Sequence, residues 1–144
     1  MIDEKLVEVR AYTGEGFLPL VYFKSWRVAV LNYIDEIHPA RIDRVERHPE
    51  TDEVFVLMCG QGILFVGEGE KEAEEIQAQV MKPGIVYNVK PQTWHTVVLS
   101  REASVLIVEN ADTGEHNSQY ARLSPEQCRF IREIARREQA GCWE

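Results

Sequence analysis

The chain has 144 residues, with 16 lysines and arginines against 24 aspartates and glutamates, which gives a formal net charge of -8. Hydrophobic residues make up 44% and charged residues 28%, a balance typical of a folded globular chain rather than a disordered one. The acidic surplus argues against non-specific binding to nucleic acid or to an anionic membrane, because both require a basic protein surface.

The same features predict one soluble, cytoplasmic domain over residues 1–144. A chain of this length can bury a core without disulfides or a structural metal. No apolar run approaches the ~20 residues of a membrane-spanning helix, and the charged N-terminus lacks a signal-peptide core. Three cysteines without CxxC spacing, Cys59, Cys128 and Cys142, suit a reducing compartment.

Most of the chain is predicted to form short β-strands. Runs of alternating, β-branched or aromatic residues lie at 17–23, 26–33, 41–46, 53–58, 63–66, 76–82, 85–89, 94–99 and 104–109. The nearly all-apolar run 53–58 predicts a strand covered on both faces, and Gly60-Gln61-Gly62 predicts a tight hairpin after it. Short strands at this regular spacing indicate an all-β sandwich or barrel.

Two segments depart from the strand pattern. The charge run 68–75 predicts a solvated hairpin loop. Residues 124–138 predict a helix, because Ser124 can cap it, Pro125 fits its first turn and Gln127 completes a capping box. Its arginines are expected to solvate the outer face of a packed helix rather than to bind DNA.

Two motifs within residues 41–110 carry the chemical signal. The first holds His48, then Glu53, then Gly60 after six intervening residues; the second runs from Gly84 to His95. In order and spacing these motifs resemble those of the cupin superfamily. The resemblance implies a cupin-type double-stranded β-helix, or jelly-roll barrel, with a short C-terminal helix over about 124–138.

The cupin resemblance also implies a ligand set for a divalent transition metal. The family's metal-binding positions fall on Glu46, His48, Glu53 and His95, with Glu46 in place of the usual first histidine. Two imidazoles with carboxylates suit Fe, Mn, Ni or Zn. The alternative is structural: each histidine could satisfy a local hydrogen bond, and Glu53 could pair with Arg44 or Arg47.

Four further residues are candidates for binding a small anionic molecule. The period of two in a strand places Arg44 on the same face as Glu46 and His48, where its guanidinium could capture a carboxylate. Lys90 is the second candidate anchor, while Asn88 and Tyr87 frame the last strands. The alternative for Arg44 is an exposed arginine at a strand end.

A narrower resemblance carries a specific reaction. Glu46-Arg47-His48-Pro49, with Tyr87-Asn88 and Trp94-His95 downstream, is similar to the ureidoglycolate lyase family, itself cupin-like. That family releases urea from ureidoglycolate to give glyoxylate. The broader prediction is a cupin-fold protein that binds a small anionic molecule in its barrel as a divalent-metal-dependent enzyme. The alternatives to it are the ureidoglycolate lyase reaction, a non-catalytic binding module, and a structural dimer with a vestigial pocket.

A homodimer is also expected. The cupin resemblance implies one, and the alternation places Val54, Val56 and Met58 on the strand face opposite Glu53, Phe55 and Leu57. That apolar face needs a cover from the other sheet, the terminal helix or a partner.

Overall fold

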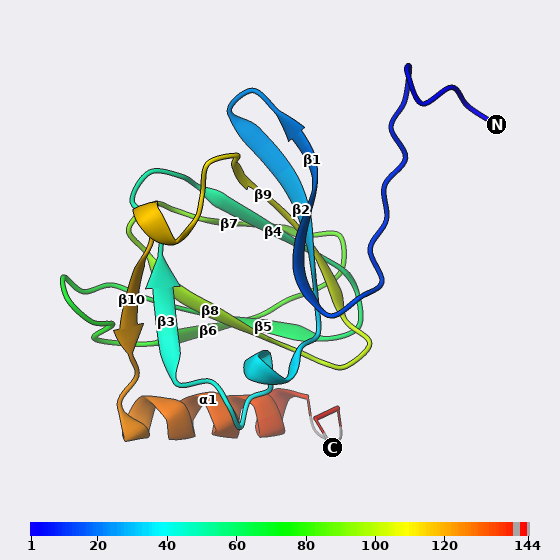
Figure 1. Ribbon diagram of the computed structural model, residues 1–144. Helices are drawn as coiled ribbons and strands as arrows, with labels where there is room; N and C mark the ends of the chain where they lie inside the picture. The colour runs from blue at the N-terminus through cyan, green and yellow to red at the C-terminus, as the bar shows by residue number, and fades with distance from the viewer. Residues whose placement is uncertain (140–141, 144) are drawn as a thin grey trace.

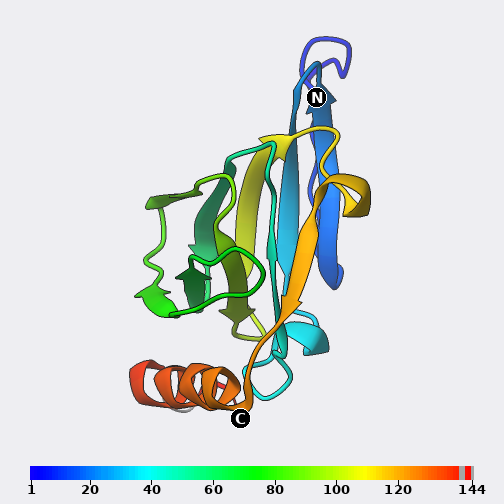
Figure 2. The ribbon, with the colours of Figure 1, turned by 90° about the vertical axis from the view of Figure 1, so that its left-hand side faces the viewer.

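Two antiparallel β-sheets face each other, and one helix covers the outer face of the second sheet (Figures 1 and 2). The computed structural model describes residues 1–139, 142 and 143. The first sheet has the order β1 (Gly16–Phe23), β2 (Trp26–Asn32), β9 (Ser104–Asn110), β4 (Glu53–Cys59) and β7 (Val86–Val89). The second has the order β10 (Gln119–Arg122), β3 (Arg44–Arg47), β8 (Trp94–Leu99), β5 (Gly62–Gly67) and β6 (Gln77–Val80).

Helical segments are few. The 3-10 helices η1 (Asp35–Ile37) and η2 (Glu115–Asn117) flank the sheets, and α1 (Pro125–Glu138) packs beneath the second sheet. The predicted capping box is confirmed, since Ser124 Oγ accepts from Gln127 N and Gln127 Oε1 accepts from Ser124 N. Within the described residues, no helix is both long enough and apolar enough to cross a membrane.

Two apolar layers hold these elements together. The layer between the sheets includes Phe55, Leu57 and Ile107 from the first sheet with Leu64 and Val97 from the second. The layer between the second sheet and α1 contains Ile63, Phe65, Trp94, Val98, Ile131 and Ile134. Strand β5 therefore alternates Leu64 toward one layer with Ile63 and Phe65 toward the other.

Two details of the strand prediction are wrong. Gly60 and its neighbours form no tight hairpin, because β4 belongs to the first sheet and β5 to the second, so the chain crosses between sheets there. Gly60 has φ +76°, and a Cβ at this position would lie 2.4 Å from the Cα of Ala103. Within a single chain, strand β4 is also not covered on both faces, since α1 lies on the other sheet and Met58 is exposed.

The remaining differences are local. Strand β3 begins at Arg44, later than the predicted run 41–46, and β10 was not predicted. The charge run 68–75 is a loop between β5 and β6, as predicted. Hydrogen bonds nevertheless hold this loop at Gly69, whose carbonyl accepts from Arg47 Nη1 and from the indole N–H of Trp94.

Packing of α1 predicts a contrast between two neighbouring substitutions. Ile131→Ala should lower the free energy of unfolding by about 3 kcal/mol, because the fully buried side chain leaves a cavity. Arg132→Ala on the exposed side should change it by less than about 0.5 kcal/mol. Urea unfolding of both variants gives the comparison, and equal small effects would contradict packing of α1 on the sheet.

Candidate metal centre in the barrel cavity

A row of ionisable side chains crosses the first sheet on the face that looks toward the second. Arg27 lies opposite Glu109 in the β2–β9 register. Val54 lies opposite Val108 in the β4–β9 register, which places Glu53 beside Glu109 on the same face. Arg27 donates to Oε2 of Glu109 through Nη2 at 2.7 Å and Nε at 3.1 Å. Strand pairing thus brings two buried carboxylates and one arginine together.

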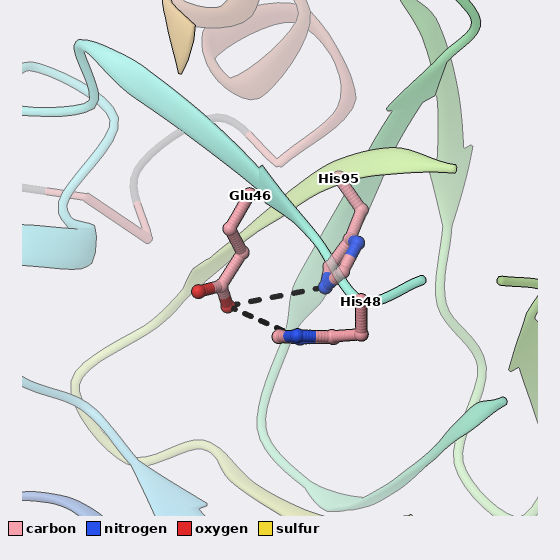
Figure 3. A group of neighbouring side chains, drawn as sticks. All are labelled: Glu46, His48 and His95. Carbon is pink, nitrogen blue, oxygen red and sulfur yellow. Dashed lines mark ion pairs between the residues drawn. The ribbon is translucent and has the colours of Figure 1, made fainter. Parts of the chain in front are cut away.

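The second sheet supplies two imidazoles and a third carboxylate. The β3–β8 register pairs Glu46 with His95, and His48 directly follows β3. The Nε2 atoms of His95 and His48 lie 2.9 and 3.1 Å from the same oxygen, Oε1 of Glu53. Oε1 of Glu46 lies 3.9 Å from each of these nitrogens (Figure 3). Four side chains from three strands and one strand end therefore converge.

The ring orientations show that a positive charge belongs between His95 and Glu53. Nδ1 of His95 lies 3.0 Å from the carbonyl oxygen of Thr93, which can only accept, so Nδ1 carries a proton. In a neutral imidazole Nε2 then presents a lone pair to the Glu53 carboxylate, and the two repel unless a proton or a metal ion lies between them. Nδ1 of His48 contacts Ser118 Oγ at 2.8 Å, which fixes the second ring.

The pKa shifts follow from this arrangement. Burial lowers the pKa of His95 and of His48, but hydrogen bonding to Glu53 and its negative charge outweigh burial and raise both. Burial raises the pKa of Glu53, but its hydrogen bonds to the two imidazoles lower it to about 2. Burial and the adjacent charge of Glu53 raise the pKa of Glu109, against the opposing effect of Arg27.

The donor set fits a divalent transition metal in both distance and charge. Two atoms bound at ~2.1 Å and at a right angle to each other lie about 3.0 Å apart, close to the separations around Glu53. Hydrogen bonds that hold Nδ1 of each ring leave Nε2 free to coordinate, as is usual for metal-bound histidine. Because Arg27 neutralises Glu109, two negative charges remain, on Glu46 and Glu53, for a divalent cation to balance.

This cluster forms part of the wall of a cavity of about 730 Å³ between the sheets. Leu31, Ile37, Phe55, Val97 and Ile107 belong to the apolar part of the lining. Charged groups reach it as well, among them Arg27, Arg41, Arg44 and Glu46. An amphipathic small molecule can therefore contact the cluster and an apolar wall together.

The sequence matches the family described as ureidoglycolate lyase over residues 3–128. The chain belongs to the ureidoglycolate lyase family. The matched segment contains the whole ionisable cluster. A search of curated proteins finds no match to the sequence.

Solved structures similar to this member of the ureidoglycolate lyase family share its fold, and the cupin-type jelly roll predicted from sequence is confirmed. A variant of Streptomyces PAC13 with uridine is 15% identical with a TM-score of 0.53, and the match covers 81% of this chain and 86% of that chain. CapF, a capsular polysaccharide assembling protein from Staphylococcus aureus, is 14% identical with a TM-score of 0.55 over 78% and 31% of the two chains. HppE in its Fe(II) form is 14% identical with a TM-score of 0.50 over 66% and 50%.

The four proposed metal ligands of this ureidoglycolate lyase family member lie together, whereas the four proposed ligand-binding residues do not. Arg44 lines the cavity, with its guanidinium 4.8 Å from the ring of Tyr120. Lys90 and Asn88 instead contact Asp52 outside the cavity lining. Tyr87 packs against the core between the sheets, and its hydroxyl accepts from the backbone N–H of Lys82.

Sequence reasoning missed Arg27, Glu109 and Ser118. One signal was present: Glu109 ends the apolar strand 104–109 on the same face as Val105 and Ile107, and a carboxylate on a core face needs a partner. Its partner Arg27 lies 82 residues away and could not be found without the strand register.

The shifted pKa values predict how the metal-free family member responds to pH. The imidazole pKa values are raised, so their stabilising contribution is complete below about 6.5 and lost as pH rises through the raised values. The Glu53 pKa is lowered to about 2, so its contribution is complete above 4.5 and lost as pH falls toward 2.

Thermal unfolding after chelation should therefore give the highest Tm in mildly acidic buffer and a lower Tm above neutrality. His95→Gln should flatten the decline at high pH, since it removes one of the titrating groups. A metal-free Tm that rises steadily from pH 5 to 8 would contradict the ionisation described above.

Proposed function

We propose that this protein is a divalent-metal-dependent lyase that releases urea from ureidoglycolate, or from a close relative, to give glyoxylate. Membership of the ureidoglycolate lyase family supports the reaction class. The single observation that carries the proposal is the convergence of two imidazole Nε2 atoms on one buried carboxylate oxygen inside a cavity.

His48, His95, Glu53 and Glu46 would hold the metal, which we propose to be Fe, Mn, Ni or Zn. Two histidines with one carboxylate make an open, three-donor arrangement, and the more exposed Glu46 supplies a fourth. When bound, such an ion supplies Lewis-acid stabilisation of the negative charge that develops on a substrate oxygen.

The chain's own residues bind and orient the substrate. Arg44 is the proposed anchor for the carboxylate, because it lines the cavity, its guanidinium lies against the ring of Tyr120, and its fork of donors suits a carboxylate. In the lyase step the hydroxyl of ureidoglycolate loses its proton and its carbon–oxygen double bond forms. The carbon–nitrogen bond breaks, and the released urea nitrogen takes up a proton. The apolar lining limits water around the reacting carbon.

Metal content and product release test the proposal together. Protein purified without chelator should contain about one divalent ion per chain and release urea and glyoxylate from ureidoglycolate. His95→Gln should lower metal occupancy and abolish turnover, because it removes a buried donor.

His116→Gln is the matched control, since His116 is exposed and outside the cluster, and it should behave as the unmodified protein. A chain that binds no divalent ion and releases no glyoxylate would contradict the proposal.

A non-catalytic binding role is the second candidate, and two observations favour it. Glu46 replaces the first histidine of the cupin motif. The cavity of about 730 Å³ falls in the size range of pockets for drug-sized ligands, whereas ureidoglycolate is much smaller. Metal binding without urea release would favour this second role.

A second copy of the chain is the proposed cover for the outer face of the first sheet. The strand registers place one continuous set of apolar side chains on this face: Leu18, Val21, Phe23, Trp26, Val28, Val54, Val56, Met58, Val86, Leu106 and Val108. Leu18, Phe23, Trp26, Met58 and Val86 are between 41% and 64% exposed. A face this apolar can be self-complementary about a twofold axis, and a stable dimer needs about 800 Å² from each partner.

Light scattering at micromolar concentration should therefore give the mass of a dimer. Val56→Glu should shift it to a monomer, because the substitution puts a charge within the apolar face, on the strand next to the central one. Arg132→Glu is the control, because Arg132 is an exposed residue of α1 on the other side of the molecule, and this variant should remain dimeric. A monomeric unmodified protein would contradict the dimer.

We also propose a cytoplasmic location. The free cysteines Cys59, Cys128 and Cys142 support it, because thiols stay reduced in that compartment.

A further inference from the structure

Neither Arg27 nor Glu109 is a ligand or a substrate contact in the function proposed above, although their ion pair lies against the proposed metal-binding cluster. Its members are shielded from solvent, with side-chain exposures of 11% for Arg27 and 2% for Glu109. Nε and Nη2 of Arg27 both donate to Oε2 of Glu109, and the Arg27 guanidinium lies 5.3 Å from the ring of Phe17. The desolvation of two buried charges costs much of the free energy that their attraction returns, so the pair adds little net stability. We therefore ask how it affects the neighbouring cluster.

Glu109 is close enough to the cluster to act as a ligand. One donor atom each from Glu109, His48 and Glu53 lie within 4.8 Å of one another. Glu109 and Glu53 are also neighbours across β4 and β9, on the same face. Arg27 engages Oε2 of Glu109, and without that ion pair the carboxylate would be free to turn toward the ion.

A third carboxylate would change the site in two ways. It would add a negative charge beyond the two that a divalent ion balances, and so hold the ion more tightly. It would also fill a position that a catalytic metal must keep open for water or substrate. A site that binds more tightly but turns over less would be the result.

We propose that Arg27 is a positioning residue that reserves Glu109 and keeps it out of the ligand set. The inference rests on the proposed function, since it requires that the cluster bind a divalent ion. Arg27 then sets the number of protein ligands around the ion and does not contact the substrate. Glu109 would become a ligand only when Arg27 no longer holds it.

Cobalt binding measures this control without any assay of activity. Isothermal titration calorimetry with Co²⁺ gives the affinity, and the d–d absorption of bound Co²⁺ weakens as its coordination number rises. Arg27→Met should bind Co²⁺ about tenfold more tightly and absorb more weakly than the unmodified protein. Glu109→Gln should bind it about tenfold more weakly, because the charge of Arg27 is left uncompensated beside the site.

The double variant Arg27→Met/Glu109→Gln removes both charges and should return affinity and absorption close to those of the unmodified protein. Arg41→Met is the matched control, since Arg41 is an exposed arginine of the same cavity, and it should change neither. If Arg27→Met fails to fold, the double variant and Glu109→Gln still carry the test, because the proposal requires the double variant to bind more tightly than Glu109→Gln.

The outcomes separate the two proposals. An unmodified protein that binds no Co²⁺ overturns the proposed function, and this inference with it. An unmodified protein that binds Co²⁺ while Arg27→Met matches Arg41→Met in affinity and absorption overturns the inference alone. Weaker binding by Arg27→Met, or equal binding by the double variant and Glu109→Gln, also overturns it.

Discussion

The contact on which the site depends is the approach of two imidazole nitrogens to one oxygen of Glu53. A carboxylate this deeply buried is costly unless positive charge or hydrogen bonds offset its lost hydration. The carbonyl of Thr93 fixes the proton of His95 on the far side of the ring, so the ring cannot satisfy Glu53 by itself in its neutral form. The need for a cation at this point links the fold to its chemistry. The cavity and the Arg27–Glu109 pair both lie beside it.

The two sheets hold this contact in place because its members occur at fixed registers. Glu53 and Glu109 are neighbours within the first sheet, and Glu46 and His95 are paired within the second. The apolar layer directly beyond them, with Phe55, Val97 and Ile107, keeps the sheets at a constant separation. A change in that layer would therefore alter the spacing between imidazoles and carboxylate without touching either. Rigid placement of donors is what metal-assisted chemistry requires.

The sequence was sufficient for the parts of the structure that local chemistry determines. Period-two alternation located most strands, and the capping box located α1. The resemblance to cupin motifs, rather than local chemistry, singled out Glu46, His48, Glu53 and His95, which the structure brings together. The sequence was insufficient where the answer depends on which strands become neighbours. Alternation assigns a side chain to a face but does not name the strand beside it, so Arg27 and Glu109 were missed and the β4–β5 connection was taken for a hairpin. Lys90 was proposed as an anchor for an anionic ligand because of its charge, yet it pairs with Asp52. Asp52 directly precedes β4, and strand alternation does not show which residues lie beside a strand end.

The most direct test of the cation between the imidazoles and Glu53 is the protonation state of the ring nitrogens, measured by long-range ¹H–¹⁵N NMR before and after addition of one equivalent of Zn²⁺. We expect His95 to keep its proton on Nδ1 throughout. We also expect Nε2 of both His48 and His95 to change from a protonated to a metal-bound nitrogen when Zn²⁺ is added. Spectra in which Zn²⁺ leaves both rings unchanged, or in which His95 carries its only proton on Nε2, would contradict it.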